Sequence, residues 1–378
     1  MKKNKNILIS GGAGFIGSNL ALYLKSLDYN VSVLDNLKQQ VHGDSPDNSV
    51  LYQNIKNKVN FILGDVTVKE DWIEAIDGQD VIVHLAAETG TGQSMYEISR
   101  YVKENVEGTA ILWDVLVNKK NTIKKIVLAS SRAIYGEGLY KCQGVCGLFT
   151  AQPRTKTEFQ ARCWDPICPV CSGPAQPMAT PETAIPIPVS LYACTKLAQE
   201  QMSLTMGKAL GISVAVLRLQ NVYGPGQSLR NPYTGILSIF SNQLRQNLPV
   251  NIYEDGAESR DFVFVKDVVQ ACTRAIEFRD RSIVVNIGSG RPTSILELAG
   301  ILKQCWRSDS PVTVTGAFRV GDIRHNWADL TQLYQLWPDW KIMNLDTGLA
   351  QFITWARGQS VFEDKTHSAE RELKARNL

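Results

Sequence analysis

The sequence predicts an α/β protein: a doubly wound parallel sheet, a smaller interleaved α/β lobe and a cysteine-rich insertion. Three observations predict it. Short apolar runs alternate with stretches of helical spacing, a glycine-rich turn joins the first run to the first helical stretch, and five of the eight cysteines fall within residues 142–171. Alternating strands and helices favour a parallel sheet with right-handed crossovers, because the helices then cover both of its faces.

Length and charge limit the class of protein. A chain of 378 residues is long enough for two domains. Its 40 basic and 37 acidic residues leave a formal charge of +3, too weak a field to gather nucleic acid or an anionic membrane. No apolar run approaches the ~18 residues of a membrane span, and no cleavage site follows the glycine-interrupted N-terminal run. We therefore expect a cytoplasmic protein with a small-molecule partner and neither nucleic acid nor membrane as a partner.

The first element is a strand, "NILIS", followed by the turn "GGAGFIG" and the helix "SNLALYLKSL". Gly12, Gly14 and Gly17 fit the pattern GxGxxG, and Gly11 together with Gly14 and Gly17 also fits GxxGxxG. Glycines let the backbone turn sharply and approach a pyrophosphate, whose charge meets the free N–H groups at the helix start. A glycine turn of this kind can also be present for packing alone. The elements that follow it must therefore show whether it binds a dinucleotide.

The second strand, "NVSVLD", supplies that context because it ends in Asp35, 18 residues beyond Gly17. A carboxylate there accepts hydrogen bonds from the adenosine ribose hydroxyls and repels a 2′-phosphate. The first part of the chain is therefore predicted to be a Rossmann-type domain that binds NAD rather than NADP.

Three further strands, "VNFILGDV", "DVIVHLAA" and "KIVLASS", alternate with the helical stretch "EDWIEAI" and a helix near 97–118. Ligands gather at the carboxyl ends of such strands. Ordinary strand-end packing explains each residue there equally well when it is taken singly. The strand-end candidates are Asp65 and Val66 to frame adenine, Leu85, Ala86 and Ala87 to leave room for the cofactor, and Ser131 to bind a substrate hydroxyl.

Further along, "YACTK" places Tyr192 and Lys196 four positions apart, on one face of a helix. Together with "GGAGFIGS", "GDV", "HLAA", "NVEGT", "SSRAIYG", "RLQNVYGPG" and "RDFVFVKDV", this order resembles the extended short-chain dehydrogenase/reductase family, in particular its sugar-nucleotide epimerases and dehydratases. The resemblance implies that Tyr192 is the catalytic base, that Lys196 lowers the pKa of the tyrosine and holds the nicotinamide ribose, and that Ser131 is the catalytic serine. A phenol of pKa ~10 needs such cationic neighbours to act as a base near neutrality.

The two residues after Ser131 separate the possible reactions. The 4,6-dehydratases of the family usually carry Asp and Glu there, whereas this chain has Arg132 and Ala133, which cannot act as that acid and base. We therefore predict a 4-epimerase that oxidises C4 to a 4-keto sugar and returns the hydride to the opposite face, regenerating NAD at each turnover. The substrate implied by the resemblance is a nucleotide sugar, dTDP-L-rhamnose or a UDP-hexose.

By the same resemblance Asn221 lies near the substrate phosphates, and Arg260 and Arg324 bind the nucleotide diphosphate, for which a planar guanidinium is well suited. Ser94 and Tyr233 are further pocket candidates, for which a loop or packing role is an equally good explanation. A homodimer, formed through the helix near 97–118 and the helix bearing Tyr192, is also implied. The predicted cofactor-binding residues are Gly11, Gly14, Phe15, Ile16, Gly17, Asp35, Asn36, Asp65, Val66, Leu85, Ala86, Ala87, Asn105, Tyr192, Lys196 and Val222.

The cysteine-rich insertion lies between Ser131 and Tyr192. Cys168 and Cys171 form a CxxC pair, and Cys142 and Cys146 form a CxxxC pair. Two such pairs separated by a loop can close a tetrahedral thiolate site, so we predict a structural zinc held by these four residues. Cys163 competes for a place in the set, and cysteines without a metal, reduced or disulfide-paired, remain the alternative.

The domain organisation expected from these patterns is a Rossmann domain over 1–138, the insertion over 139–187, and a return to the Rossmann domain with the catalytic helix over 188–225. Residues 226–357 form mainly the substrate-binding lobe, with 257–280 returning to the first domain, and a polar, mobile tail covers 358–378. Two other functions stay open. One is a 4,6-dehydratase or 4-ketosugar reductase, and the other is an NAD-sensing binding protein without catalysis.

Overall fold

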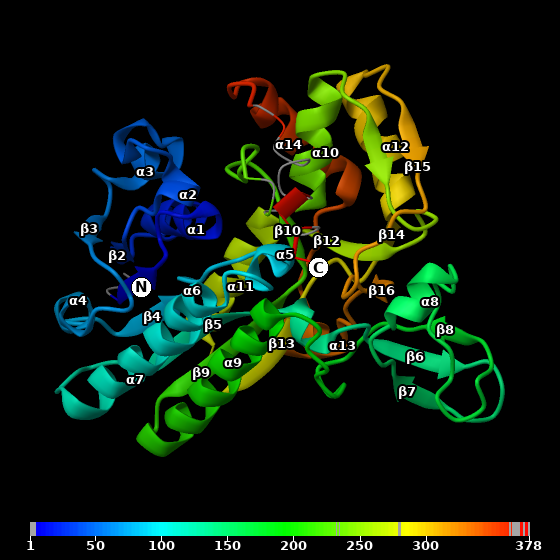
Figure 1. The fold of residues 1–378 in the computed structure, drawn as a ribbon. Helices are drawn as coiled ribbons and strands as arrows, with labels where there is room; N and C mark the ends of the chain where they lie inside the picture. The colour runs from blue at the N-terminus through cyan, green and yellow to red at the C-terminus, as the bar shows by residue number, and fades with distance from the viewer. Residues whose placement is uncertain are drawn as a thin grey trace.

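The computed structural model describes residues 5–231, 233, 235–278, 281–362, 364, 371–372 and 375–376. A seven-stranded sheet forms the middle layer of its larger lobe, on the left and lower side of Figure 1. Every strand pair in this sheet is parallel, and the strand order is β13-β9-β5-β4-β1-β2-β3. The predicted doubly wound parallel sheet is thereby confirmed. Its strands are β1 (Asn6–Ser10), β2 (Asn30–Asp35), β3 (Asn60–Leu63), β4 (Val81–His84), β5 (Lys125–Ser131), β9 (Ser213–Leu219) and β13 (Ile283–Ile287).

Helices cover both faces of the sheet, because successive side chains of a strand point to opposite faces. In β1, Ile7 and Ile9 pack into one apolar cluster and Leu8 into the other. Burying one such side chain completely contributes roughly 1.5–3 kcal/mol, so the alternation fixes the sheet between its two layers. The first layer contains α1 (Phe15–Ser26), α3 (Val50–Ile55), α11 (Val265–Glu277) and α13 (Thr331–Leu336), and the second contains α4 (Lys69–Ala75), α7 (Gly108–Asn118) and α9 (Leu191–Leu210).

A second lobe lies beyond the carboxyl ends of these strands and has its own apolar core (Figure 1). Phe264, Leu298 and Phe352 are fully buried in that core. This part corresponds to the smaller α/β lobe expected from the sequence. Its strands are β10 (Asn221–Tyr223), β11 (Val250–Ile252), β12 (Ser259–Phe264), β14 (Pro292–Ser294), β15 (Val312–Val314) and β16 (His325–Asn326), and its helices are α10 (Ile236–Arg245), α12 (Ile295–Trp306) and α14 (Leu345–Arg357).

The cysteine-rich insertion forms a small antiparallel sheet of its own, which projects beside β16 (Figure 1). The strand β6 (Leu139–Cys142) lies between β7 (Leu148–Thr150) and β8 (Ala175–Pro177). The short helix α8 (Lys156–Gln160) begins at a capping box, in which Thr155 and Glu158 satisfy each other's backbone N–H groups.

The helix predicted near 97–118 is interrupted. It consists of α6 (Ile98–Tyr101), a π-helical stretch η2 (Val102–Glu107) and α7. The wider turn carries the fully buried Asn105, whose amide exchanges hydrogen bonds with the backbone of Glu88 at 2.7 and 3.2 Å. Such π-helical turns are frequent at functional sites. The remaining short helices are α2 (Gln39–His42), η1 (Pro46–Asn48), α5 (Thr91–Ser94) and η3 (Arg132–Tyr135).

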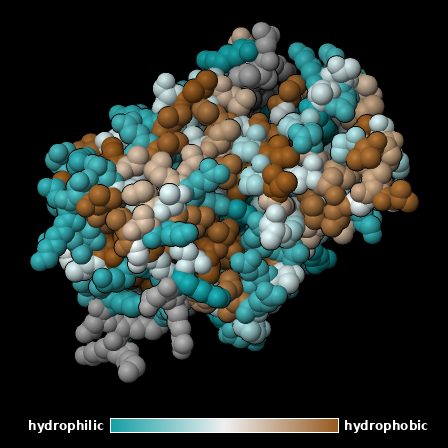
Figure 2. All heavy atoms as spheres, turned by 90° about the horizontal axis from the view of Figure 1, so that it is seen from below, coloured by the Kyte–Doolittle hydropathy of each residue, from teal (hydrophilic) through white to brown (hydrophobic). Residues whose placement is uncertain are grey.

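Hydrophilic and hydrophobic residues are interspersed on the face shown in Figure 2. Within the described part of the chain, no helix has both the length and the apolar character required to span a bilayer. The expected domain boundaries remain a prediction. The expectation of a mobile tail falls largely on residues outside the described ones, namely 363, 365–370, 373–374 and 377–378, although the described Glu372 accepts hydrogen bonds from Tyr96 and Tyr233 at 2.7 and 3.0 Å.

Candidate active site

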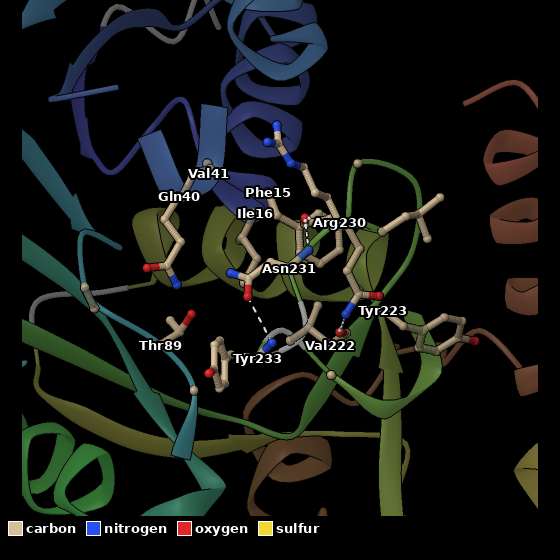
Figure 3. A pocket seen from close by; sticks show the side chains of 18 of the residues that line it. Phe15, Ile16, Gln40, Val41, Thr89, Val222, Tyr223, Arg230, Asn231 and Tyr233 are labelled. Atoms are coloured by element: carbon tan, nitrogen blue, oxygen red, sulfur yellow. Dashed lines mark hydrogen bonds between the residues drawn. The ribbon is translucent and has the colours of Figure 1, made fainter. Parts of the chain in front are cut away.

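A cavity of about 1190 Å³ lies between the carboxyl edge of the parallel sheet and the second lobe. Its volume exceeds the usual range for a single small-molecule site, so it has room for a dinucleotide and a second ligand. Figure 3 shows part of its wall, where Tyr233 lies near Thr89 and its backbone N–H donates to Asn231 at 2.9 Å. The predicted residues that line the cavity are Gly11, Gly14, Phe15, Ile16, Gly17, Asp35, Asn36, Val66, Leu85, Ala86, Ala87, Ser131, Tyr192, Lys196, Asn221, Val222, Tyr233 and Arg260.

The glycine turn between β1 and α1 has no space for side chains. Gly11 has a φ of +71°, and a Cβ there would lie 2.7 Å from the backbone nitrogen of Ala86. A Cβ on Gly17 would lie 2.3 Å from the carbonyl oxygen of Gly11. On the side away from the cavity, the turn is therefore packed tightly against neighbouring backbone atoms. On the cavity side, the backbone N–H groups at the start of α1 are open to an anion.

Asp35 lies at the carboxyl end of β2 and lines the cavity, as the sequence predicts. Its carboxylate accepts hydrogen bonds of 2.9 Å from the backbone nitrogens of Ala13 and Leu37, which fix its orientation. Burial raises the pKa of Asp35, and these two backbone donors oppose the rise. The carboxylate is thus held rigidly beside the glycine turn, where a ribose would lie.

Tyr192 and Lys196 project from the same face of α9, one turn apart, and both line the cavity. The helix begins at Ser190, whose hydroxyl accepts from the backbone nitrogen of Ala193 at 3.2 Å. Lys196 is only 4% exposed, its ammonium donates to Gln199 at 2.9 Å, and burial lowers its pKa to about 7. Burial raises the pKa of Tyr192, whereas the side chains of Ser131 and Arg132 act to lower it.

Arg132 is a site residue whose role the sequence pattern does not predict, because there it only stands in place of a carboxylate. It follows Ser131 at the end of β5, lines the cavity, and donates from Nε to the side-chain oxygen of Asn221 at 3.0 Å. Burial lowers the pKa of Arg132 to about 9, with the nearby Arg260 adding to the effect. A cation directly after the strand-end serine was the available signal.

The second lobe contributes further charged residues that the sequence did not single out, namely Arg230, Glu258, Arg319 and Asp322. Burial raises the pKa of Glu258 to about 7. Arg319 lies over the ring of Tyr253, with its guanidinium carbon 4.7 Å from the ring centroid. Arg319 precedes the predicted Arg324 by five residues in "FRVGDIR", which was the signal for it.

Four predicted residues do not line the cavity. Ser94 is fully buried and its hydroxyl accepts from the backbone nitrogen of Tyr192 at 3.0 Å, so it positions the tyrosine from behind. The side chain of Asn105 is hydrogen-bonded to the backbone of Glu88 and to the hydroxyl of Thr195. The carboxylate of Asp65 accepts hydrogen bonds from Asn36 and Thr67.

Arg324 is the fourth, and the structure differs here from the role of diphosphate ligand that the sequence suggested. Its guanidinium forms ion pairs with Asp165 at 2.8 Å, Glu254 at 3.1 Å and Asp255 at 2.6 Å. A cation already surrounded by three carboxylates, 2% exposed and outside the cavity wall, is not available to a ligand.

The four predicted metal ligands Cys142, Cys146, Cys168 and Cys171 come together in the insertion, with their sulfur atoms within 4.8 Å of one another. All are free thiols. Cys163, the competing candidate, is exposed and outside the group, with its sulfur facing the carbonyl of Ala161 at 3.9 Å. The donor set is that of a closed, four-coordinate thiolate site.

Fold and site together define a dinucleotide-binding α/β enzyme. The chain belongs to the NAD dependent epimerase/dehydratase family, which it matches over residues 7–156 and 170–288, with a gap inside the insertion. It is 38% identical over 357 residues to a dTDP-L-rhamnose 4-epimerase of Burkholderia thailandensis, covering 93% of this chain and 94% of that protein.

Solved structures extend the comparison. A UDP-glucose 4-epimerase of Thermotoga maritima with UDP-glucose superposes with a TM-score of 0.74 at 29% identity, covering 93% of this chain and 98% of that one. A UDP-glucuronic acid 4-epimerase of Bacillus cereus, in complex with UDP-glucuronic acid and NAD, gives a TM-score of 0.74 at 25% identity, covering 93% and 99%. All three of these proteins are named as sugar-nucleotide 4-epimerases, and the Bacillus cereus structure contains NAD.

Proposed function

We propose that this chain is an NAD-dependent sugar-nucleotide 4-epimerase. The observation that carries the proposal is that Ser131, Tyr192 and Lys196 line the same cavity as the glycine turn and Asp35, opposite the charged residues of the second lobe. The two relatives from Burkholderia thailandensis and Thermotoga maritima, which are named as 4-epimerases, support the same reaction.

The residues present fit NAD. Side chains on Gly11 or Gly17 would collide with backbone, which is the property of a turn that must let a pyrophosphate approach. Asp35 offers its carboxylate at the position that binds ribose hydroxyls. When bound, NAD supplies the hydride acceptor for C4 of the sugar and the donor for its return.

The chain's own residues supply the proton transfer. Tyr192 as phenolate takes the proton of the C4 hydroxyl, and Ser131 donates a hydrogen bond to the same oxygen. Lys196 and Arg132 favour the phenolate by their positive charge. The 4-keto sugar then turns within the cavity, and Tyr192 returns the proton to the oxygen of the epimer. Arg260, Arg319 and Asn221 face the diphosphate side of the substrate.

Dehydration is the poorer proposal because it needs an acid and a base beside C5 and C6. Arg132 and Ala133 occupy those positions. Glu137, the next carboxylate along the chain, is 2% exposed and pairs with Arg154 at 3.0 Å, so it is already committed. Among nucleotide sugars, we propose dTDP-L-rhamnose first, following the 38% identical relative, and a UDP-hexose second.

Zinc is our proposal for the cysteine group. Four thiolates close the coordination shell, so the metal is structural and has no open position for water. An insertion with so small a core depends on the metal for its folding energy. Elemental analysis of the purified protein is expected to give one zinc per chain, retained in Cys163→Ser and lost in Cys168→Ser. A metal-free wild-type protein would refute the assignment.

A homodimer and a cytoplasmic location complete the proposal. The dimer is supported by exposed apolar side chains along the segment from α6 to α7, namely Ile98, Val102 and Val117. Light scattering tests the dimer, and cell fractionation tests the location.

The deciding experiment is proton NMR of UDP, dTDP, GDP and CDP sugars incubated with catalytic NAD. Epimerisation yields a C4 isomer without accumulated NADH, whereas a dehydratase leaves a 4-keto-6-deoxy product and a reductase consumes NAD(P)H stoichiometrically. Tyr192→Phe is expected to abolish turnover and retain NAD affinity. A fully active Tyr192→Phe variant, or no product from any sugar, contradicts the proposal.

A further inference from the structure

Residues 315–324 form a coil between β15 and β16 that shapes the substrate side of the cavity. Arg319 and Asp322 of this coil line the cavity directly. Its last two carbonyls, of Ile323 and Arg324, accept hydrogen bonds of 2.7 and 3.0 Å from the guanidinium of Arg260. The direction of Arg260 and the position of Arg319 therefore both depend on where this coil lies.

The cysteine-rich insertion packs against the far side of the coil through aromatic rings. Phe159 of α8 stacks on Phe318, with centroids 5.2 Å apart and planes at 14°. Trp164 lies against the same ring at 6.4 Å. Because Phe318 is the immediate neighbour of Arg319, these contacts fix the coil at the point where it reaches the cavity.

Arg154 of the insertion then holds the coil's backbone. Its Nη2 donates to the carbonyl of Asp322 at 2.8 Å, while Nε and Nη1 pair with Glu137 at 3.0 Å and Glu254 at 2.8 Å. The Arg154 side chain is 2% exposed, and so is that of Glu254, so water does not weaken these pairs. One guanidinium thus joins the insertion, the first domain and the coil.

Asp165 provides a second connection through Arg324. It accepts from Nε of Arg324 at 2.8 Å. The backbone nitrogen of Arg324 donates to Glu137 at 2.6 Å, which places the carbonyl of the same residue toward Arg260. The charged residues therefore form one continuous hydrogen-bonded group from the insertion to the cavity wall.

All of these insertion residues lie between the two cysteine pairs. Arg154, Phe159, Trp164 and Asp165 fall after Cys146 and before Cys168, so a metal bound by Cys142, Cys146, Cys168 and Cys171 fixes both ends of the segment that contacts the coil. We infer that the metal-closed insertion is part of the substrate-binding apparatus: through Arg154 and Asp165 it positions the coil 315–324, and with it Arg260 and Arg319, for the nucleotide diphosphate. This inference rests on the proposed epimerase function and deepens it. Arg154 is a positioning residue, because it does not line the cavity.

Arg154→Met tests the connection directly. The KM for the converted nucleotide sugar is expected to rise roughly tenfold or more, because small displacements of ligand-binding groups weaken binding strongly. The kcat is expected to stay within about threefold and NAD affinity to stay unchanged, since the guanidinium of Arg154 is hydrogen-bonded to Glu137, Trp164, Glu254 and Asp322, none of which belongs to α9 or the glycine turn. Arg154→Lys keeps the positive charge but loses the planar fork of donors. Its KM is expected to lie between those of the wild type and Arg154→Met. If Arg154→Met does not fold, Asp165→Asn provides the same test, because Asp165 is an exposed carboxylate whose replacement does not disturb the core. A smaller increase in KM is expected for it.

The metal end is tested by calorimetry, titrating UDP and dTDP into the NAD-loaded protein. Cys171→Ser is expected to lose its metal and bind the preferred diphosphate about tenfold more weakly, while Cys163→Ser, the matched control in the same segment, keeps both. Unchanged KM and diphosphate affinity in Arg154→Met, Asp165→Asn and Cys171→Ser would overturn the inference while leaving the epimerase intact. A wild-type protein that binds neither diphosphate and converts no sugar would instead overturn the proposed function, and the inference with it.

Discussion

The guanidinium of Arg132 donates from Nε to the side-chain oxygen of Asn221 at 3.0 Å, which joins the end of β5 to the start of β10 beside Tyr192. Among the described residues, no hydrogen-bond partner is found for the terminal nitrogens of Arg132, which lies on the cavity wall. Its charge is therefore held in one place, where it opposes the effect of burial on the pKa of the phenol.

Arg132→Met is expected to move the acid limb of the pH profile of kcat/KM to higher pH. Burial raises the pKa of Tyr192 and the charge of Arg132 lowers it, so removing the charge raises it further. Below the pKa, each unit of increase reduces the phenolate fraction about tenfold, and activity at neutral pH falls accordingly. Initial rates between pH 5.5 and 9.5 measure the shift, with Arg132→Lys as the control that keeps a cation. An unchanged profile in Arg132→Met would show that the guanidinium does not act on the base.

Lys196 makes the folded state sensitive to pH. Burial lowers its pKa from 10.5 to about 7, so the unfolded chain holds the proton more tightly than the folded one between these values. The free energy of unfolding contributed by this group therefore rises as pH increases from about 7 toward 10. Lys196→Met is expected to flatten that rise and to raise the midpoint of thermal unfolding at pH 7 by a few degrees, roughly the effect of 1–2 kcal/mol, while abolishing most turnover.

Thermal unfolding at several pH values, without cofactor, measures this effect. Lys208→Met is the matched control, since Lys208 is an exposed lysine on the same helix. A wild-type dependence on pH that persists in Lys196→Met would assign the effect to another group.

The sheet and the strand-end part of the cavity wall were predictable because they follow from local pattern. The glycine turn, Asp35 and the helical spacing of Tyr192 and Lys196 each lie at a strand end or on a helix face, and parallel strands bring their carboxyl ends together. Which arginine of the coil 315–324 reaches the cavity was not predictable. Arg319 and Arg324 belong to one coil, and only the tertiary positions of Asp165, Glu254 and Asp255 determine that Arg324 is enclosed. The cysteine pairs were assigned by spacing, whereas the contact of their loop with Phe318 depends on packing across about 160 residues of chain.

Asp35→Ala is expected to reduce discrimination between NAD and NADP. The carboxylate is fixed by the backbone nitrogens of Ala13 and Leu37, so it cannot turn away from a 2′-phosphate. Its removal loses the hydrogen bonds to the ribose hydroxyls and weakens NAD binding by an expected ~10-fold or more, while the repulsion of NADP disappears. Fluorescence titrations with both cofactors measure the ratio of the two affinities. An unaltered ratio would place the specificity elsewhere.

Gly17→Ala tests whether the turn between β1 and α1 must remain free of side chains. A Cβ at Gly17 would lie 2.3 Å from the carbonyl oxygen of Gly11 and 2.6 Å from the Cα of Gly12, and both are backbone atoms that move only if the turn moves. Overpacking of this kind costs typically ~1–3 kcal/mol of folding free energy, and the displaced turn no longer presents its N–H groups to a pyrophosphate. We expect a lower unfolding midpoint in urea and at least ~10-fold weaker NAD binding.

The matched control is Gly300→Ala in α12, where an added Cβ meets no atom within 4 Å. Alanine exceeds glycine in helix propensity by ~1 kcal/mol, so this variant is expected to be as stable as the wild type or more so, with unchanged NAD affinity. Replacing glycine by alanine is therefore expected to change the folding stability in opposite directions at these two helical positions. Should Gly17→Ala bind NAD as the wild type does, the close approach of backbone to the pyrophosphate could not be the reason for the glycine, and the cofactor site would have to be reassigned.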